Sequence, residues 1–185
     1  MQVTKTALEG VLILEPKVFG DARGWFMETW SARKFEAFGL NFNFVQDNQS
    51  YSAQRGTLRG LHYQTAPFAQ AKLVRCTRGK LLDVAVDIRE GSETFAKWIA
   101  VELTAENKKQ LLIPRGFAHG FLTLTDDVEI QYKADNFYAP TCDGNIIWND
   151  AEINIAWNFE PTILADKDAK APTLHERLER GELKF

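Results

Sequence analysis

Two side chains suited to acid–base and anion chemistry stand three residues apart in the stretch GTLRGLHYQ, residues 56–64. Arg59 and His62 lie there among apolar residues, in a segment otherwise typical of a β-strand, and the chain has only three histidines. Histidine titrates near neutral pH and can act as a general base, whereas the arginine guanidinium suits phosphate or carboxylate oxygens. A lone histidine beside apolar residues is more often structural than catalytic, so other residues must decide its role.

Other groups suited to proton transfer or charge stabilisation occur in segments with a two-residue period. Tyr132 shares a face with Val128 and Ile130, whereas Lys72 and His119 fall on the apolar faces of their own segments. Each has an ordinary structural explanation when taken singly. Burying several ionisable groups together is costly unless pairing or function compensates, so their combination favours a functional site inside the fold.

The elements that must position these groups are mostly strands. Residues 80–90, KLLDVAVDIRE, alternate between apolar and largely polar positions, which predicts a half-buried strand. Similar alternation occurs in AQAKLVRC, TFAKWIAVELT and DDVEIQYKADNFY, with turn residues between the segments. The sequence therefore predicts an all-β, jelly-roll (cupin-like) double-sheet barrel with a few short helices.

Helical signals are few. SARKFEAFG predicts a short helix that ends at Gly39, and TAEN predicts at most a single turn. Thr173 and Glu176 form the pattern of a capping box, which predicts a short charged helix closed by Gly181.

Composition limits the class of protein. With 185 residues, 45% of them hydrophobic, the chain is long enough for one full core, and we expect a single domain over residues 1–185. The net charge of −3, with acidic and basic residues interspersed, argues against nucleic-acid binding. Cys76 and Cys142 lack CxxC spacing, which fits a reducing compartment. No signal-like or membrane-spanning stretch is evident, and we expect a cytoplasmic protein that does not bind membranes.

The N-terminal segment, about residues 1–30, has an unusual distribution of aromatic residues. In VFGDARGWFMETW a glycine-containing turn precedes Trp25, Phe26 and Trp30, which fall on both faces of any strand formed there. This pattern predicts that the segment packs against another subunit or the outside of the barrel.

Metal and nucleophile signatures are weak. The HxH pair of many metal-binding cupins is absent, although His62 and His119 could meet in space, which leaves a metal site as an open alternative. There is no GxSxG motif and no glycine-rich phosphate loop.

Several long blocks carry a family resemblance. They include LILEPKVFGDARGWFMETW, FVQDNQSYS, GTLRGLHYQ, LLIPRGFAHGFLTL, YKADNFYAP and IIWND. With these blocks the sequence resembles the dTDP-4-dehydrorhamnose 3,5-epimerase family over nearly its whole length.

The resemblance implies a homodimeric jelly roll without metal or cofactor, acting on a nucleotide sugar. Its reaction would invert C3 and C5 of dTDP-4-dehydro-6-deoxy-D-glucose by removing protons next to the C4 ketone. The positions match His62 as the base, Tyr132 as the proton donor, Asp168 as the carboxylate that orients His62, and Lys72 as the cation near the C4 oxygen.

The resemblance also implies a set of binding residues. Arg23 and Arg59 match a diphosphate-binding pair, and Phe26 and Tyr138 match aromatics that hold the base. Glu28, Gln46, Asn48, His119, Asp143 and Lys167 match polar contacts to the substrate. Position 143 departs from the family, which often has Glu where this chain has Asp143. The segment with Arg23, Phe26 and Glu28 is expected to reach the partner subunit's site.

Two alternatives stay open at this level. One is a 3- or 5-only epimerase on a related nucleotide 4-keto sugar, and the other is a non-catalytic sugar-nucleotide binding protein. A binding protein has no need for His62, Asp168 and Tyr132 together.

Overall fold

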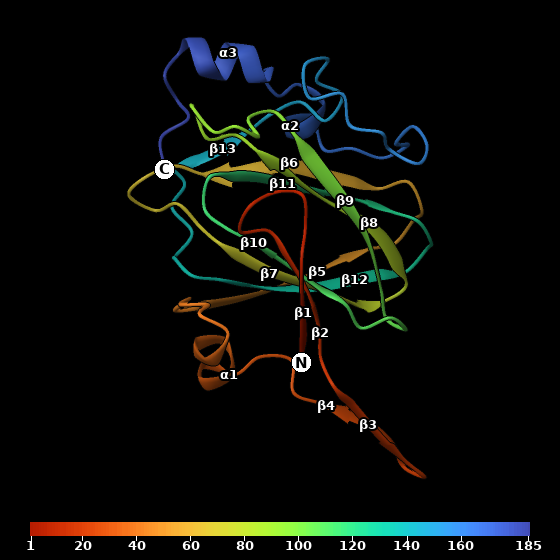
Figure 1. Ribbon diagram of the computed structural model, residues 1–185. Coiled ribbons are helices and arrows are strands. Elements are labelled where there is room, and N and C mark those ends of the chain that lie inside the picture. The colour runs from red at the N-terminus through yellow and green to blue at the C-terminus, as the bar shows by residue number, and fades with distance from the viewer.

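Two antiparallel sheets stacked face to face form the body of the computed structural model, which describes residues 1–185 (Figure 1). The strands are β1 (Gln2–Lys5), β2 (Leu12–Glu15), β3 (Val18–Asp21), β4 (Gly24–Met27), β5 (Gln46–Ser52), β6 (Leu58–Gln64), β7 (Lys72–Arg78), β8 (Lys80–Asp87), β9 (Trp98–Thr104), β10 (Gln110–Ile113), β11 (Phe117–Thr123), β12 (Val128–Ala134) and β13 (Asp143–Asn145). The helices are α1 (Ala32–Ala37), α2 (Asp166–Ala169) and α3 (Leu174–Glu179). The prediction of an all-β jelly roll with a few short helices is confirmed.

The strand order places the sheet-forming residues in two layers. One sheet has the order β1-β2-β10-β7-β12-β5, and the other has the order β13-β6-β11-β8-β9. The main hydrophobic core lies between them and includes Val74, Leu111, Phe121 and Ile130. Tyr132 packs against this core, which confirms its predicted inward orientation.

Strand β8 departs from the half-buried strand predicted for residues 80–90. Its apolar residues Leu82, Val84 and Val86 pack in a second core on the outer side of the five-stranded sheet. Asp83 and Asp87 instead point to the other side and are fully buried. The prediction was wrong because the C-terminal part of the chain covers the apolar face, while the polar face belongs to the barrel interior.

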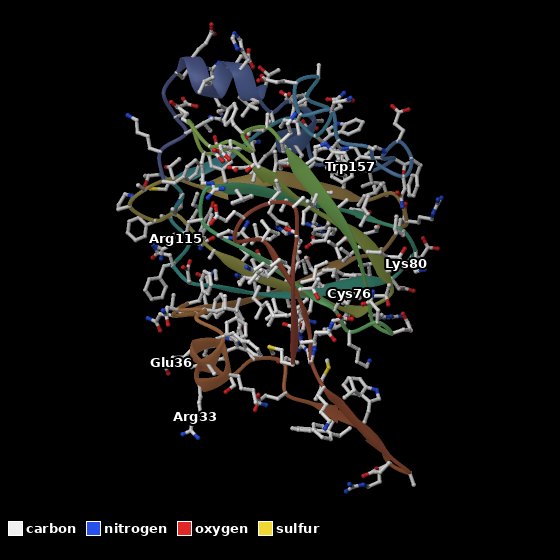
Figure 2. The ribbon with its side chains drawn as sticks, viewed as in Figure 1. Arg33, Glu36, Cys76, Lys80, Arg115 and Trp157 are labelled. Carbon is white, nitrogen blue, oxygen red and sulfur yellow. The ribbon has the colours of Figure 1, made fainter.

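The C-terminal segment forms that covering layer. Helices α2 and α3 lie beyond the five-stranded sheet (Figure 1), and Figure 2 shows Trp157 in the same layer, where it packs on the second core. Thr173 and Glu176 make both hydrogen bonds of the predicted capping box. Gly181 has a φ of 62°, a conformation that glycine adopts readily at a helix end.

The N-terminal elements extend on the opposite side of the molecule. Helix α1, confirmed where SARKFEAFG predicted it, buries Phe35 against a small third core on the outer face of the six-stranded sheet. Strands β3 and β4 form a separate hairpin that projects from the body (Figure 1). Trp25 and Phe26 on this hairpin are 59% and 69% exposed. None of the helices is both long enough and apolar enough to span a membrane.

Candidate active site

A cavity of about 520 Å³ opens between the two sheets. The polar residues that line it are Ser50, Thr57, Arg59, His62, Lys72, His119, Tyr132, Lys167 and Asp168, and the apolar residues include Leu58, Phe121, Ile130, Ile163 and Leu164. His62 and His119 come from the five-stranded sheet, whereas Lys72 and Tyr132 come from the six-stranded sheet. The cavity therefore brings together residues that are up to 118 positions apart, from Ser50 to Asp168.

His62 and Asp168 form a hydrogen-bonded pair in this cavity. The Nε2 atom of His62 lies 2.7 Å from Oδ1 of Asp168, and Oδ2 of Asp168 accepts a hydrogen bond of 3.2 Å from the Gly60 amide. Burial acts to raise the pKa of Asp168, but the hydrogen bonds from His62 and Gly60 prevail and lower it. An ionised carboxylate can only accept, so Nε2 is the nitrogen that carries the proton, and in the neutral form of the imidazole Nδ1 of His62 has the lone pair. That is the arrangement of an oriented general base.

A glycine contact explains how Arg59 and His62 reach the same cavity. Gly60 has a φ of 134°, and a Cβ atom on it would lie 2.5 Å from the Cα of Gly120 on β11. The β6–β11 register shifts at this point, between His119 and Phe121. The irregularity interrupts the strict alternation of side chains that would otherwise send residues 59 and 62 to opposite faces.

A second histidine–carboxylate pair lies beside the first. His119 is the register partner of His62 across β11 and β6, and its Nε2 lies 2.8 Å from Oδ1 of Asp83. Burial lowers the pKa of His119 although Asp83 opposes this, so the imidazole is neutral at pH 7. With Oδ1 of Asp83 accepting a hydrogen bond from the Nε2–H of His119, the other ring nitrogen of the neutral imidazole is an acceptor.

Lys72 supplies a positive charge to the cavity. Burial lowers its pKa to about 8, partly offset by the carboxylates of Asp143 and Asp83. Its Nζ lies 6.0 Å from the ring centroid of Tyr132. An ammonium in this setting can stabilise an enolate oxygen more strongly than it could in water.

Tyr132 retains its proton at neutral pH. Burial raises the pKa of its phenol, with Arg59 acting in the opposite direction. A neutral phenol on the sheet that faces His62 can donate a proton to a ligand held between the two sheets.

Arg59 lies at the exposed edge of the cavity. Its guanidinium donates to the hydroxyl of Ser52 and to the carbonyl oxygen of Tyr51. These bonds fix the side chain while leaving donors for an anion.

The remaining predicted binding residues fall into two groups. Gln46, Asn48 and Tyr138 lie together, because the Gln46 amide donates to Asn48 and accepts from the backbone N–H of Tyr138. Lys167 on α2 makes a 2.7 Å ion pair with Asp143 on β13.

Arg23, Phe26 and Glu28 are not brought to this cavity. Arg23 pairs with Asp21 at the tip of the exposed β3–β4 hairpin, and Glu28 pairs with Lys34 of α1. Within one chain these three residues are therefore separate from the other predicted site residues.

Sequence reasoning missed two parts of the site. The alternation in residues 80–90 places Asp83 on the polar face of the strand, which predicts contact with solvent. The structure instead buries Asp83 beside His119, and the alternation is the only sequence signal that relates to its position. The Gly60 amide has no sequence signal at all. The structure contains no group of three or more His, Cys, Asp or Glu side chains that could hold a metal ion.

A jelly-roll barrel whose cavity holds a carboxylate-paired imidazole, a phenol and an ammonium has the groups for proton transfer at a carbon next to a carbonyl, which is the chemistry of a sugar epimerase. The model of one such family, described as dTDP-4-dehydrorhamnose 3,5-epimerase, matches residues 5–176. The chain belongs to this family.

Individual relatives agree with that assignment. The chain is 56% identical over 169 residues to a dTDP-4-dehydrorhamnose 3,5-epimerase of Shigella flexneri, covering 91% of this chain and 93% of that protein. It is similar, with a TM-score of 0.93 and 42% identity, to the crystal structure of an epimerase from Legionella pneumophila in complex with dTDP-4-keto-L-rhamnose. That match covers 99% of this chain and 97% of the other. A dTDP-4-dehydro-6-deoxyglucose 3-epimerase of Streptomyces bikiniensis is 40% identical over 171 residues, 91% of this chain and 86% of that protein.

Proposed function

We propose that the chain converts dTDP-4-dehydro-6-deoxy-D-glucose to dTDP-4-dehydro-L-rhamnose by epimerisation at C3 and C5. The observation that carries the proposal is the cavity that holds His62 of the five-stranded sheet, paired with Asp168 of α2, opposite Lys72 and Tyr132 of the six-stranded sheet. Family membership and the names of the relatives support it.

The reaction follows from the acidity of carbons next to a ketone. Nδ1 of His62 removes the proton from such a carbon, and the electrons of the broken C–H bond move toward the C4 oxygen. The Lys72 ammonium stabilises the enolate, and the Tyr132 hydroxyl returns a proton from the opposite side. No electrons are gained or lost, so these steps need no redox cofactor, and the Lys72 ammonium supplies the positive charge that a metal ion could otherwise provide.

Substrate binding is assigned to the groups around this centre. Arg59 binds the diphosphate, Tyr138 stacks on the base, and His119 accepts a hydrogen bond from a sugar hydroxyl. Gln46, Asn48, Asp143 and Lys167 supply further polar contacts to the substrate.

Residues 1–185 are assigned to one epimerase domain that acts as a homodimer. The exposed Trp25 and Phe26 support a role for the N-terminal segment, about residues 1–30, in the partner subunit's site. Arg23, Phe26 and Glu28 would then complete a cavity to which they do not contribute within their own chain.

Mixing inactive variants tests this arrangement. His62→Ala and Arg23→Ala should each be inactive alone, but subunit exchange should restore activity, because one site of the mixed dimer carries neither substitution. A protein that sediments as a monomer with full activity contradicts the arrangement.

We infer a cytoplasmic location. Cys76 and Cys142 are buried and unpaired, and burial raises the pKa of the Cys76 thiol to about 11, which suits a thiol that stays reduced.

Incubation with the substrate in heavy water tests the function itself. Deuterium uptake at two carbons, read by mass spectrometry, is the expected result for 3,5-epimerisation. Uptake at one carbon would favour a 3- or 5-only epimerase, an alternative supported by the name of the Streptomyces bikiniensis relative. Tight binding with no uptake would favour a non-catalytic binding protein.

A further inference from the structure

The helix that carries Asp168 is too short to hold itself in place. α2 comprises only Asp166–Ala169, and its N-cap residue Ala165 makes no side-chain capping bond. An isolated single turn of helix is unstable in water, because nucleation fixes several residues for very few hydrogen bonds. The position of Asp168 therefore depends on contacts from outside the helix.

The strand beside His62 provides such a contact. The side-chain Nδ2 of Asn145 on β13 donates a 2.9 Å hydrogen bond to the backbone carbonyl of Lys167, the residue before Asp168. Asn145 is also the direct register partner of His62 on β6. Asn145 thus contacts both the strand of His62 and the helix of Asp168, two residues that are 106 positions apart in the chain.

The Asn145 amide is itself held in one orientation. Arg177 on α3 donates from Nη2 to the Oδ1 of Asn145 at 2.7 Å and from Nε to its backbone carbonyl at 2.9 Å. The side chain of Arg177 is only 16% exposed and also pairs with Glu182. Because Arg177 occupies the amide oxygen, the amide NH₂ group must point toward Lys167.

A second contact between β13 and α2 is an ion pair between two side chains. The Lys167 ammonium pairs with Asp143, but both side chains are assigned to substrate binding above. A ligand that takes either group weakens that ion pair, whereas the bond from Asn145 to the Lys167 carbonyl uses no substrate-binding atom. We therefore expect the hydrogen bond from Asn145 to the Lys167 carbonyl to keep β13 and α2 together while the substrate is bound.

We propose that Asn145 is a positioning residue for the catalytic base, oriented by Arg177. It holds the backbone of α2 against the strand opposite His62, and so keeps the Asp168 carboxylate at hydrogen-bonding distance from the imidazole. Its effect on turnover rests on the proposed function, whereas its effect on the His62 hydrogen bond does not.

The first test measures that hydrogen bond without any substrate. In the proton NMR spectrum the His62 Nε2–H, assigned with a His62→Ala sample, should exchange with water at least about tenfold faster in Asn145→Ala than in the wild type. The Nε2–H of His119, which is held by Asp83, serves as an internal reference and should not change. Asn145→Asp, which keeps the shape but removes the donor, should behave like Asn145→Ala.

The second test separates positioning from general destabilisation. Asn145→Ala should lower kcat between about tenfold and about a hundredfold with KM within about threefold, as expected for a misplaced catalytic group. Asn107→Ala is the matched control, because Asn107 makes three comparable side-chain bonds to the backbone in the turn before β10. Its melting temperature should fall similarly while kcat and the His62 signal stay at the wild-type values.

A double-mutant cycle completes the argument. In the Asp168→Asn background, Asn145→Ala should change kcat by less than about twofold, because the group that it positions no longer functions. Wild-type exchange at His62 in both Asn145 variants, or an equal loss of kcat in both backgrounds, overturns the proposal. A wild-type enzyme that fails to turn over the dTDP sugar would refute the proposed function while leaving the exchange test decisive for Asn145.

Discussion

Replacing Tyr132 by phenylalanine should separate the two halves of the proposed reaction. His62 would still remove a proton from the sugar, exchange it with solvent and return it to the same face. Inversion requires a proton from the opposite face, where the variant offers only water. Deuterium exchange should therefore survive, and epimerised product should nearly disappear.

The structure sets the size of both effects. The Tyr132 hydroxyl makes no hydrogen bond within the chain while its ring packs on the main core, so its loss should change the free energy of unfolding by less than about 1 kcal/mol. General acid catalysis typically contributes about 10²–10⁴-fold, equivalent to about 3–5 kcal/mol of the barrier. Inversion should fall by that factor, while the rate of label uptake stays within about tenfold of the wild-type rate.

The assay follows label by mass spectrometry and product by NMR in the same heavy-water sample. Tyr63→Phe is the matched control, because this tyrosine lies on β6 beside His62, packs in the second core and has a buried hydroxyl without a partner. It should retain activity and gain up to about 1 kcal/mol of stability. A folded Tyr132→Phe enzyme that inverts the sugar at the wild-type rate would show that another group is the acid.

Three further expectations concern Lys72, Asp87 and the removal of metal ions. Because burial lowers the pKa of Lys72 to about 8, kcat/KM should fall as the pH rises through about 8, and Lys72→Met should lose most of the activity together with this alkaline limb. Desolvation acts to raise the pKa of Asp87, but hydrogen bonds from Arg89, Ser92 and Thr94 hold it at about 2, below the ordinary 3.8. This carboxylate should contribute about 2 kcal/mol of stability above about pH 4 that is lost as the pH falls through about 2, so urea unfolding should separate wild type from Asp87→Asn at pH 7 and bring them together near pH 2. Exhaustive dialysis against a chelator should leave kcat unchanged, and a loss reversed by one added divalent metal would contradict the acid–base mechanism.

The alternation of side chains was sufficient to predict the main architecture. A strand has a period of two residues wherever it occurs, so the inward direction of Tyr132 and Lys72 could be read from their neighbours. The capping box at Thr173 is equally local, since two residues three positions apart, Thr173 and Glu176, form it. Such features depend on short-range geometry that the sequence displays directly.

Other features depend on which parts of the chain meet. The alternation in β8 predicts two distinct faces, but only the position of the C-terminal layer decides that the apolar face points outward and that Asp83 points into the barrel interior, where it pairs with His119. The one-turn helix α2 has too few residues for a periodic signal, and the proximity of Asp168 to His62 came from family resemblance alone. Long-range contacts of this kind have no local signature.

The separation of His62 from Asp168 also affects how the protein matures during synthesis. All thirteen strands end by Asn145, and Asp168 follows 23 residues later. Since chains emerge from the ribosome N-terminus first, both sheets can be synthesised completely before the carboxylate exists outside the ribosome. A chain cut short between these two points would contain every strand and the imidazole, yet it would lack the charge that orients the imidazole. Catalytic competence is thus one of the last properties that the growing polypeptide acquires.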